Sequence, residues 1–269
     1  MRGIGVMLLG GLCVWGLVAL PVQAAAEGDV KITWLGHAAF VIESIEGKVI
    51  YIDPFLKNPK APPGAETVKR ADLVLVTHGH GDHVGSAVEI VKKTGAKLVA
   101  IFDLGKILIQ QGLPAEALVG MNKGGTVTPV GEKVRISMVH ADHSSAVEVK
   151  DEATGKIRME SGGEATGFII RLENGFTIYH AGDTDLFGDM QLIRERYRPD
   201  LVMLPVGGHF TMDPQDAARA ARLLQPKHAV PMHYGTFPVL KGTGEAFAEA
   251  LKGSPVKVHL MKPGETLAF

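Results

Sequence analysis

Residues 73–85 read LVLVTHGHGDHVG and join an apolar run to a dense group of metal-binding side chains. Within six positions the run is followed by His78, His80, Asp82 and His83. An uninterrupted apolar segment is typical of a strand buried on both faces, and the glycines between the polar residues allow the backbone to turn sharply. The stretch therefore predicts a rigid strand that ends in a metal-binding turn.

Imidazole and carboxylate groups suit zinc and its first-row neighbours. Four such groups could satisfy one ion, but the adjacent Asp82 and His83 cannot easily share an ion with both His78 and His80. The natural alternative is two ions about 3.5–4 Å apart, as in two-metal hydrolases. A histidine-rich surface loop would need four ligand-type residues to follow a buried strand by chance.

A second ion needs further ligands, and the chain offers candidates at turns that follow other apolar segments. These are His140 and His143 in VHADHSS, Asp183 in YHAGDTD and His233 in PMHYG.

The N-terminal segment and the bulk composition indicate where the protein acts and which partners it does not favour. Arg2, an apolar stretch over 4–20 and the small residues at 23–26 have the layout of a secretory signal. We expect cleavage after Ala24 or Ala26, with an uncleaved anchor as the alternative, and therefore a signal peptide over 1–26. No interdomain linker is evident in the rest of the chain, so we expect one domain over 27–269. The only cysteine, Cys13, lies in the signal, so a mature exported chain has no disulfide and no thiolate ligand. A net charge of −1 gives no electrostatic case for binding nucleic acid or an anionic membrane.

Strand and helix patterns alternate along the rest of the chain. We expect strands over 30–35, 40–44, 48–52, 72–76, 97–101, 133–139, 167–172, 176–180, 201–206, 228–232, 256–261 and 266–269. We expect helices over 84–93, from a cap at Asp103 to 111, from a cap at Asp213 to 224, and over 245–251. Hairpins mixed with strand–helix units favour mixed sheets covered by helices.

Several of these motifs together resemble the metallo-β-lactamase superfamily. The matching residues are THGHGDH at 77–83, a later histidine, GDT at 182–184 and MHYGTFP at 232–238. WLGHAAF at 34–40 and DPF at 53–55 are similar to a branch of small predicted metal-dependent hydrolases, related to ascorbate-phosphate lactonases and N-acylethanolamine-type phospholipases. The resemblance implies a four-layer αβ/βα sandwich of two mixed sheets flanked by helices.

The resemblance also implies a ligand set. His78, His80 and His143 would hold one ion, Asp82, His83 and His233 the other, and Asp183 would bridge them. His143 is preferred to His140 because a serine follows it directly. Two divalent ions, zinc first with manganese, iron or nickel as alternatives, would lower the pKa of a shared water, which Asp82 or Asp183 could orient.

Other residues are assigned roles near this centre. His37 is either close to the metals and substrate or a structural turn residue, and Asp53 either orients a ligand histidine or only starts a turn. His209 could protonate a leaving group. The polar segment 144–165 is either a hairpin over the site or a solvated insertion.

These observations favour an exported, periplasmic or secreted hydrolase that cleaves an ester, lactone or phosphoester of a small molecule. The alternatives are a non-catalytic zinc-binding or interaction module and a β-lactam hydrolase. The absence of an evident arginine or lysine cluster near the motifs favours a neutral ester or lactone. The sequence leaves the oligomeric state open.

Overall fold

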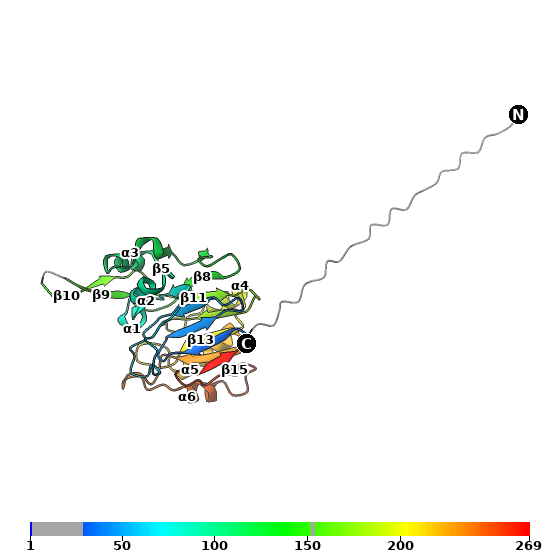
Figure 1. Ribbon diagram of the computed structural model, residues 1–269. Coiled ribbons are helices and arrows are strands. Elements are labelled where there is room, and N and C mark those ends of the chain that lie inside the picture. The colour runs from blue at the N-terminus through cyan, green and yellow to red at the C-terminus, as the bar shows by residue number, and fades with distance from the viewer. Residues whose placement is uncertain (2–28, 152–153) are drawn as a thin grey trace.

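A computed structural model describes residue 1 and residues 29–151 and 154–269. The predicted signal peptide and Cys13 lie outside these residues, apart from Met1. Two seven-stranded sheets form the centre of the molecule, with helices at either end of the view in Figure 1.

The first sheet is antiparallel on one side and parallel on the other. Its strands are, in spatial order, β16 (Thr266–Ala268), β1 (Lys31–Trp34), β2 (Phe40–Glu43), β3 (Val49–Ile52), β4 (Leu73–Leu75), β5 (Lys97–Ile101) and β6 (Leu118–Met121). Strands β16 to β3 pair antiparallel and β3 to β6 pair parallel. The last strand of the described chain thus closes the sheet beside the first.

The second sheet has the same design. Its strands are, in spatial order, β15 (Lys257–Val258), β14 (His228–Met232), β13 (Leu201–Pro205), β12 (Thr177–His180), β11 (Thr166–Arg171), β8 (Arg135–His140) and β7 (Thr126–Val127). Strands β7 to β12 pair antiparallel, and β12 to β15 pair parallel. A separate hairpin, β9 (Ala146–Lys150) with β10 (Ile157–Ser161), projects from the body of the molecule in Figure 1.

Each sheet carries its own helices. The first half contributes α1 (Gly81–Val84), α2 (Ala87–Thr94), α3 (Phe102–Gln110) and the 3-10 turn η1 (Ala115–Ala117), and the second contributes α4 (Met190–Tyr197), α5 (Pro214–Leu224) and α6 (Gly244–Ala250). Strand β13 shows how the layers are built: Leu201 and Met203 face the core shared with the first sheet, whereas Val202 and Leu204 face the core under α5. This confirms the predicted αβ/βα sandwich.

Local chemistry explains where the best-predicted elements begin. The Asp213 carboxylate accepts hydrogen bonds from the amides of Gln215 and Asp216 at 2.8 and 2.9 Å, and Pro214 occupies the first turn. Side-chain caps of this kind satisfy amides that the first helical turn leaves free. Helix α5 consequently begins and ends where the sequence predicts.

Other boundaries were predicted wrongly. Val84 belongs to the short α1, and α2 begins only at Ala87, because Gly85 takes a left-handed φ of 42° between them. Asp103 lies inside the first turn of α3, whose cap is Ile101. The strand expected over 256–261 is limited to β15. Strand β6 and helix α4 were missed because one contains a glycine and the other has few apolar residues.

None of the helices in the described ranges combines the length and the apolar character needed to cross a bilayer.

Candidate metal centre

The histidine-rich turn is fixed to the end of β4 by a buried aspartate. Asp53 accepts hydrogen bonds from the amide of Thr77 at 2.8 Å and from its hydroxyl at 2.7 Å. Two positions further along, the amide of Gly79 donates to Ser145 Oγ at 3.1 Å. The ligand-type residues therefore begin from a backbone that is anchored on both sides.

One group of candidate ligands consists of His78, His80 and His143, whose nearest ring nitrogens all lie within 4.8 Å of one another. His78 Nε2 and His80 Nδ1 are 3.0 Å apart. His143 reaches them from the loop that follows β8, on the other sheet. His140, the alternative considered from the sequence, is exposed and its ring packs edge-on against Phe187 at 4.9 Å.

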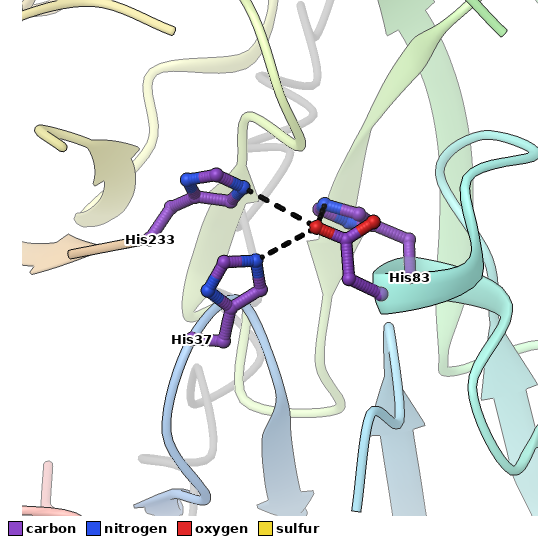
Figure 2. A group of neighbouring side chains, drawn as sticks. His37, His83 and His233 are labelled. Atoms are coloured by element: carbon purple, nitrogen blue, oxygen red, sulfur yellow. Dashed lines mark hydrogen bonds and ion pairs between the residues drawn. The ribbon is translucent and has the colours of Figure 1, made fainter. Parts of the chain in front are cut away.

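The second group surrounds the carboxylate of Asp82. His37 Nε2 lies 3.0 Å from Asp82 Oδ2, and the Nε2 atoms of His233 and His83 lie 3.8 and 4.0 Å from it. Figure 2 shows the rings of His37, His83 and His233 turned toward one carboxylate. These residues come from the β1–β2 turn, from α1 and from the end of β14.

Asp183 connects the two groups. Its Oδ2 atom lies 3.0 Å from His233 Nε2, 3.2 Å from His83 Nε2 and 3.7 Å from His143 Nε2. Asp183 is buried and follows β12 through Gly182, which has a φ of 64°. The structure therefore brings together all seven ligands predicted from the sequence, with Asp183 between the two sets.

The donor atoms fit divalent metal ions. Asp183 Oδ1 and His233 Nδ1 are buried and have no hydrogen-bond partner in the described part of the chain, and the buried His83 Nε2 and His233 Nε2 have carboxylate oxygens as their polar neighbours, Asp183 Oδ2 at 3.2 and 3.0 Å and Asp82 Oδ2 at 4.0 and 3.8 Å. An unsatisfied buried polar atom costs about 1–3 kcal/mol, so a cluster of them points to a ligand that accepts their lone pairs. Ions of the zinc series bind this combination of nitrogen and carboxylate oxygen.

The electrostatics of the site agree with cation binding. Burial lowers the pKa of His78 well below its usual value and also lowers that of His143, which keeps both in the neutral form that binds metal. Burial opposes ionisation of Asp183, yet His233 and His83 hold its pKa well below the usual range. Burial likewise opposes a charge on His83, but Asp183 and Asp53 raise its pKa well above its usual value. The buried carboxylates therefore make positive charge at the centre favourable, as a bound cation would provide.

Two residues outside the predicted ligand set hold ligands in place. Asp53 Oδ2 lies 2.7 Å from His83 Nδ1, which leaves His83 Nε2 facing the centre. His37 contacts Asp82 through Nε2 and the Thr236 hydroxyl through Nδ1 at 3.0 Å. Hydrogen bonds of this kind fix the orientation of metal ligands, so both residues contact ligands instead of serving only as turn residues.

The remaining histidines lie outside the centre. His209 is exposed, packs against Phe210 and makes none of the hydrogen bonds or ion pairs that join the described cluster. His180 is buried and structural, as predicted. His228 and His259 are half-buried and lie 3.0 Å apart, ring nitrogen to ring nitrogen.

Sequence reasoning missed Thr77, Ser145 and Thr236, the hydroxyls that support the cluster. Thr77 is adjacent to His78 and Thr236 is three residues from His233, so proximity to the motifs was their only signal. The described part of segment 144–165 contains the paired strands β9 and β10, and its Ser144 hydroxyl lies 3.4 Å from His80 Nε2. The base of this hairpin therefore borders the candidate centre.

The comparisons with known proteins agree with this geometry. The family model described as “Beta-lactamase superfamily domain” matches residues 31–233. The chain belongs to this superfamily. A UPF0173 metal-dependent hydrolase of Cupriavidus necator is 48% identical over 258 residues, covering 93% of this chain and 89% of the relative. A second, of Thermodesulfovibrio yellowstonii, is 43% identical over 260 residues, covering 93% and 96%.

Solved structures show the same metallo-β-lactamase fold. Igni18, described as a novel metallo hydrolase of Ignicoccus hospitalis, is 38% identical, with a TM-score of 0.78 over 90% of this chain and 98% of that one. An isothiocyanate hydrolase from Delia radicum gut bacteria has a TM-score of 0.67 over 89% and 99% but is 21% identical, so it supports the fold alone. The protein is a metal-dependent hydrolase of the metallo-β-lactamase superfamily, which favours an enzyme over a non-catalytic module.

Proposed function

We propose that the protein is an exported hydrolase that uses two divalent ions to cleave a neutral ester or lactone of a small molecule. The observation that supports two ions is the position of Asp183, one carboxylate within 3.7 Å of ring nitrogens from both ligand groups. His78, His80 and His143 would hold one ion. Asp82, His83 and His233 would hold the other, with Asp183 between them.

Bound divalent ions supply Lewis-acid polarisation of the scissile group and lower the pKa of water. The chain's own residues would orient the reactants. Asp82 Oδ2 is fixed by His37, so a carboxylate oxygen with a defined direction is available to accept a proton from attacking water. His209, which the sequence suggested as the proton donor to the leaving group, lines a pocket with Gly207 and Gly208 that includes none of the candidate ligands, so no proton transfer is assigned to it.

The charges around the centre support a neutral substrate. In the described part of the chain, the hydrogen bonds and ion pairs of the cluster involve histidine, aspartate, threonine and serine, and none involves arginine or lysine. Recognition of a phosphoester usually employs arginine or lysine. A neutral ester or lactone is therefore favoured, with phosphoesters and β-lactams as the competing classes.

Export is proposed from the basic start, apolar middle and small residues of segment 1–26. Expression of the full chain in a bacterium with two membranes, followed by fractionation and mass determination, tests it. A shortened chain in the periplasmic fraction is expected, and a full-length chain in the cytosol would argue against export.

The metal proposal is tested by Asp183→Asn in the full chain loaded separately with zinc, manganese, iron or nickel. Wild type should contain about two metal equivalents by elemental analysis and hydrolyse a member of a panel of aryl esters, lactones, phosphodiesters and β-lactams. Asp183→Asn should retain one equivalent or less and lose turnover. Asp185→Asn, two residues away and exposed, is the matched control and should behave as wild type. A fully active enzyme with a single equivalent would contradict the dinuclear proposal.

A further inference from the structure

A pocket lies between helix α4 and the second sheet, at the end of β8 that is opposite to the metal centre. It has a volume of about 280 Å³ and is lined by Thr126, Arg135, Ser137, Arg171, Arg196 and Tyr197. The pocket brings Arg196 and Tyr197 of helix α4 together with Arg171 of β11; Figure 1 labels both elements. Three guanidinium groups thus share one small pocket, and none of the described residues that line it is acidic.

Two of these arginines are opposite each other on neighbouring strands of the second sheet. Arg135 on β8 and Arg171 on β11 are direct partners in the antiparallel register. Like charges at such positions destabilise a sheet by roughly 0.2–1 kcal/mol. Within the described ranges, neither side chain forms an ion pair or hydrogen bond with another residue, so their repulsion is not relieved inside the molecule.

The surrounding acids are already engaged elsewhere. Asp200 Oδ1 pairs with Lys227 Nζ at 2.8 Å while its other oxygen accepts from the Thr177 amide. Glu195, on α4, accepts a hydrogen bond from Gln191 at 3.0 Å. Among the described residues, neither acid forms an ion pair with the arginines of the pocket, so the charge of these arginines is not paired there.

The third arginine and its neighbours complete a set of fixed donors. Arg196 lies over the Tyr197 ring, 4.9 Å from its centre, and Nη2 donates to the Gly124 carbonyl at 3.4 Å. The Tyr197 hydroxyl is buried and has no partner among the described residues. Thr126 Oγ1 and Ser137 Oγ lie 2.7 Å apart and share one hydrogen bond. The lining of the pocket thus contains hydroxyl and guanidinium groups from β7, β8, β11 and α4.

We propose that this pocket binds a compact oxyanion of two or more negative charges, with a phosphate group as the typical ligand. Planar guanidinium groups match the oxygen geometry of phosphate and carboxylate and form charge-assisted hydrogen bonds with them. An anion between Arg135 and Arg171 would remove their mutual repulsion, and its oxygens would supply acceptors for Arg196.

The site is separate from the metal centre. Arg135 begins β8 and His140 ends it, and His143 follows, so the pocket and the metal ligands lie at opposite ends of this strand. At about 3.3 Å per residue, six residues span roughly 17–20 Å. The anion site therefore goes beyond the proposed hydrolysis and does not depend on it.

The test is a calorimetric titration of the metal-loaded chain with inorganic phosphate, comparing wild type with Arg135→Gln/Arg171→Gln. Because phosphate can also bind metal ions, the arginine-dependent part of the signal is the measurement. Loss of both guanidinium groups should weaken that binding at least tenfold. The matched control is Arg219→Gln on α5, an exposed arginine paired with Asp216, and it should leave phosphate binding unchanged.

Thermal unfolding gives a second readout. Without phosphate the double variant should be as stable as wild type or more so, because the like-charge pair is gone, and phosphate should raise its Tm less. Equal phosphate affinity in wild type, in Arg135→Gln/Arg171→Gln and in the control Arg219→Gln would overturn the proposal. So would binding to phosphatidylglycerol vesicles without binding to free phosphate, since that would assign the arginines to a lipid surface.

Discussion

At the scale of single residues, His37 connects the parts of the centre. Its main-chain carbonyl accepts hydrogen bonds from the Trp34 indole at 2.9 Å and from the His233 amide at 3.0 Å. Its ring lies between Asp82 and Thr236, and its φ of 55° is rare for a residue other than glycine. Burial lowers the pKa of His37 to about 4, against the raising effect of the hydrogen bond that its ring donates to Asp82. The ring is therefore neutral at pH 7, with Nε2–H directed at the carboxylate.

Thr236→Val tests this arrangement. A neutral His37 that donates to Asp82 must accept at Nδ1, and the Thr236 hydroxyl is its partner at 3.0 Å. Valine has the same shape without the donor, so we expect a loss of about 1–3 kcal/mol in the free energy of unfolding and roughly 10-fold weaker metal binding. Urea titration and competition with a chelator measure the two effects.

Thr236→Ser keeps the hydroxyl and is the matched control. It should retain metal affinity close to that of wild type. If serine and valine weaken the chain and its metal binding to the same extent, the hydrogen bond to His37 has no role in fixing Asp82.

His180 makes a second residue-scale prediction, on pH. Its Nε2 donates to the Ala38 carbonyl at 2.9 Å and its Nδ1 accepts from the Gly182 amide at 3.2 Å. Burial lowers the pKa of His180 below 6.5, despite the raising effect of Asp53. As pH falls below 6.5 the unfolded chain gains a proton that the folded chain resists. Stability should therefore fall with decreasing pH, by up to about 1.4 kcal/mol per pH unit for this group.

The measurement compares the free energy of unfolding of wild type and His180→Gln between pH 7.5 and 5.5. Metal release is common to both chains, so the difference in slope reports His180. A shallower slope is expected for the variant, and parallel curves would show that His180 does not resist protonation in the folded chain.

At the scale of elements, the ligands follow the ends of buried strands. The loops after β4, β8, β12 and β14 supply every predicted ligand apart from those within α1. Apolar runs and nearby polar residues revealed these loops in the sequence. The spacing could not reveal the close approach of the β9–β10 hairpin to the turn at Gly79, because that contact depends on tertiary packing of a polar, weakly patterned segment.

Gly79→Ala tests the packing of that hairpin. A Cβ at Gly79 would lie 2.6 Å from Val147 Cγ2 and 3.0 Å from the Ala146 carbonyl oxygen. Such overpacking costs about 1–3 kcal/mol, so Tm should drop by several degrees, with a displaced turn and weaker metal binding. Gly81→Ala is the control from the same motif, because its Cβ would meet no atom within 4 Å. Equal melting temperatures for the two variants would show that the hairpin shifts to accommodate the added methyl group without a loss of stability.

At the scale of the whole molecule, the sequence predicted the sandwich fold better than it predicted the individual helices and the boundaries of the elements. Leu201–Pro205 and His228–Met232 were found because continuous apolar runs mark strands buried on both faces. Helix α4, with five charged or polar residues in MQLIRERY, lacked such a pattern and is defined by packing of Met190 and Ile193 on the second core. The proposed anion pocket could not be predicted from the sequence, because Arg135 and Arg171 become neighbours only through the register of β8 and β11.

The two sheets meet at the metal centre, which predicts that metal holds the molecule together. His78, Asp82 and His83 come from the first sheet and its α1, whereas Asp183 and His233 come from the second. A ligand that binds only the folded chain stabilises it by about 2.7 kcal/mol at 100 times its Kd, or roughly 5–10 °C for a chain of this size. Chelation, checked by elemental analysis, should lower Tm by this amount, and added zinc should restore it. Asp183→Asn should respond far less. A metal-free wild type with unchanged Tm would show that metal binding does not join the two sheets.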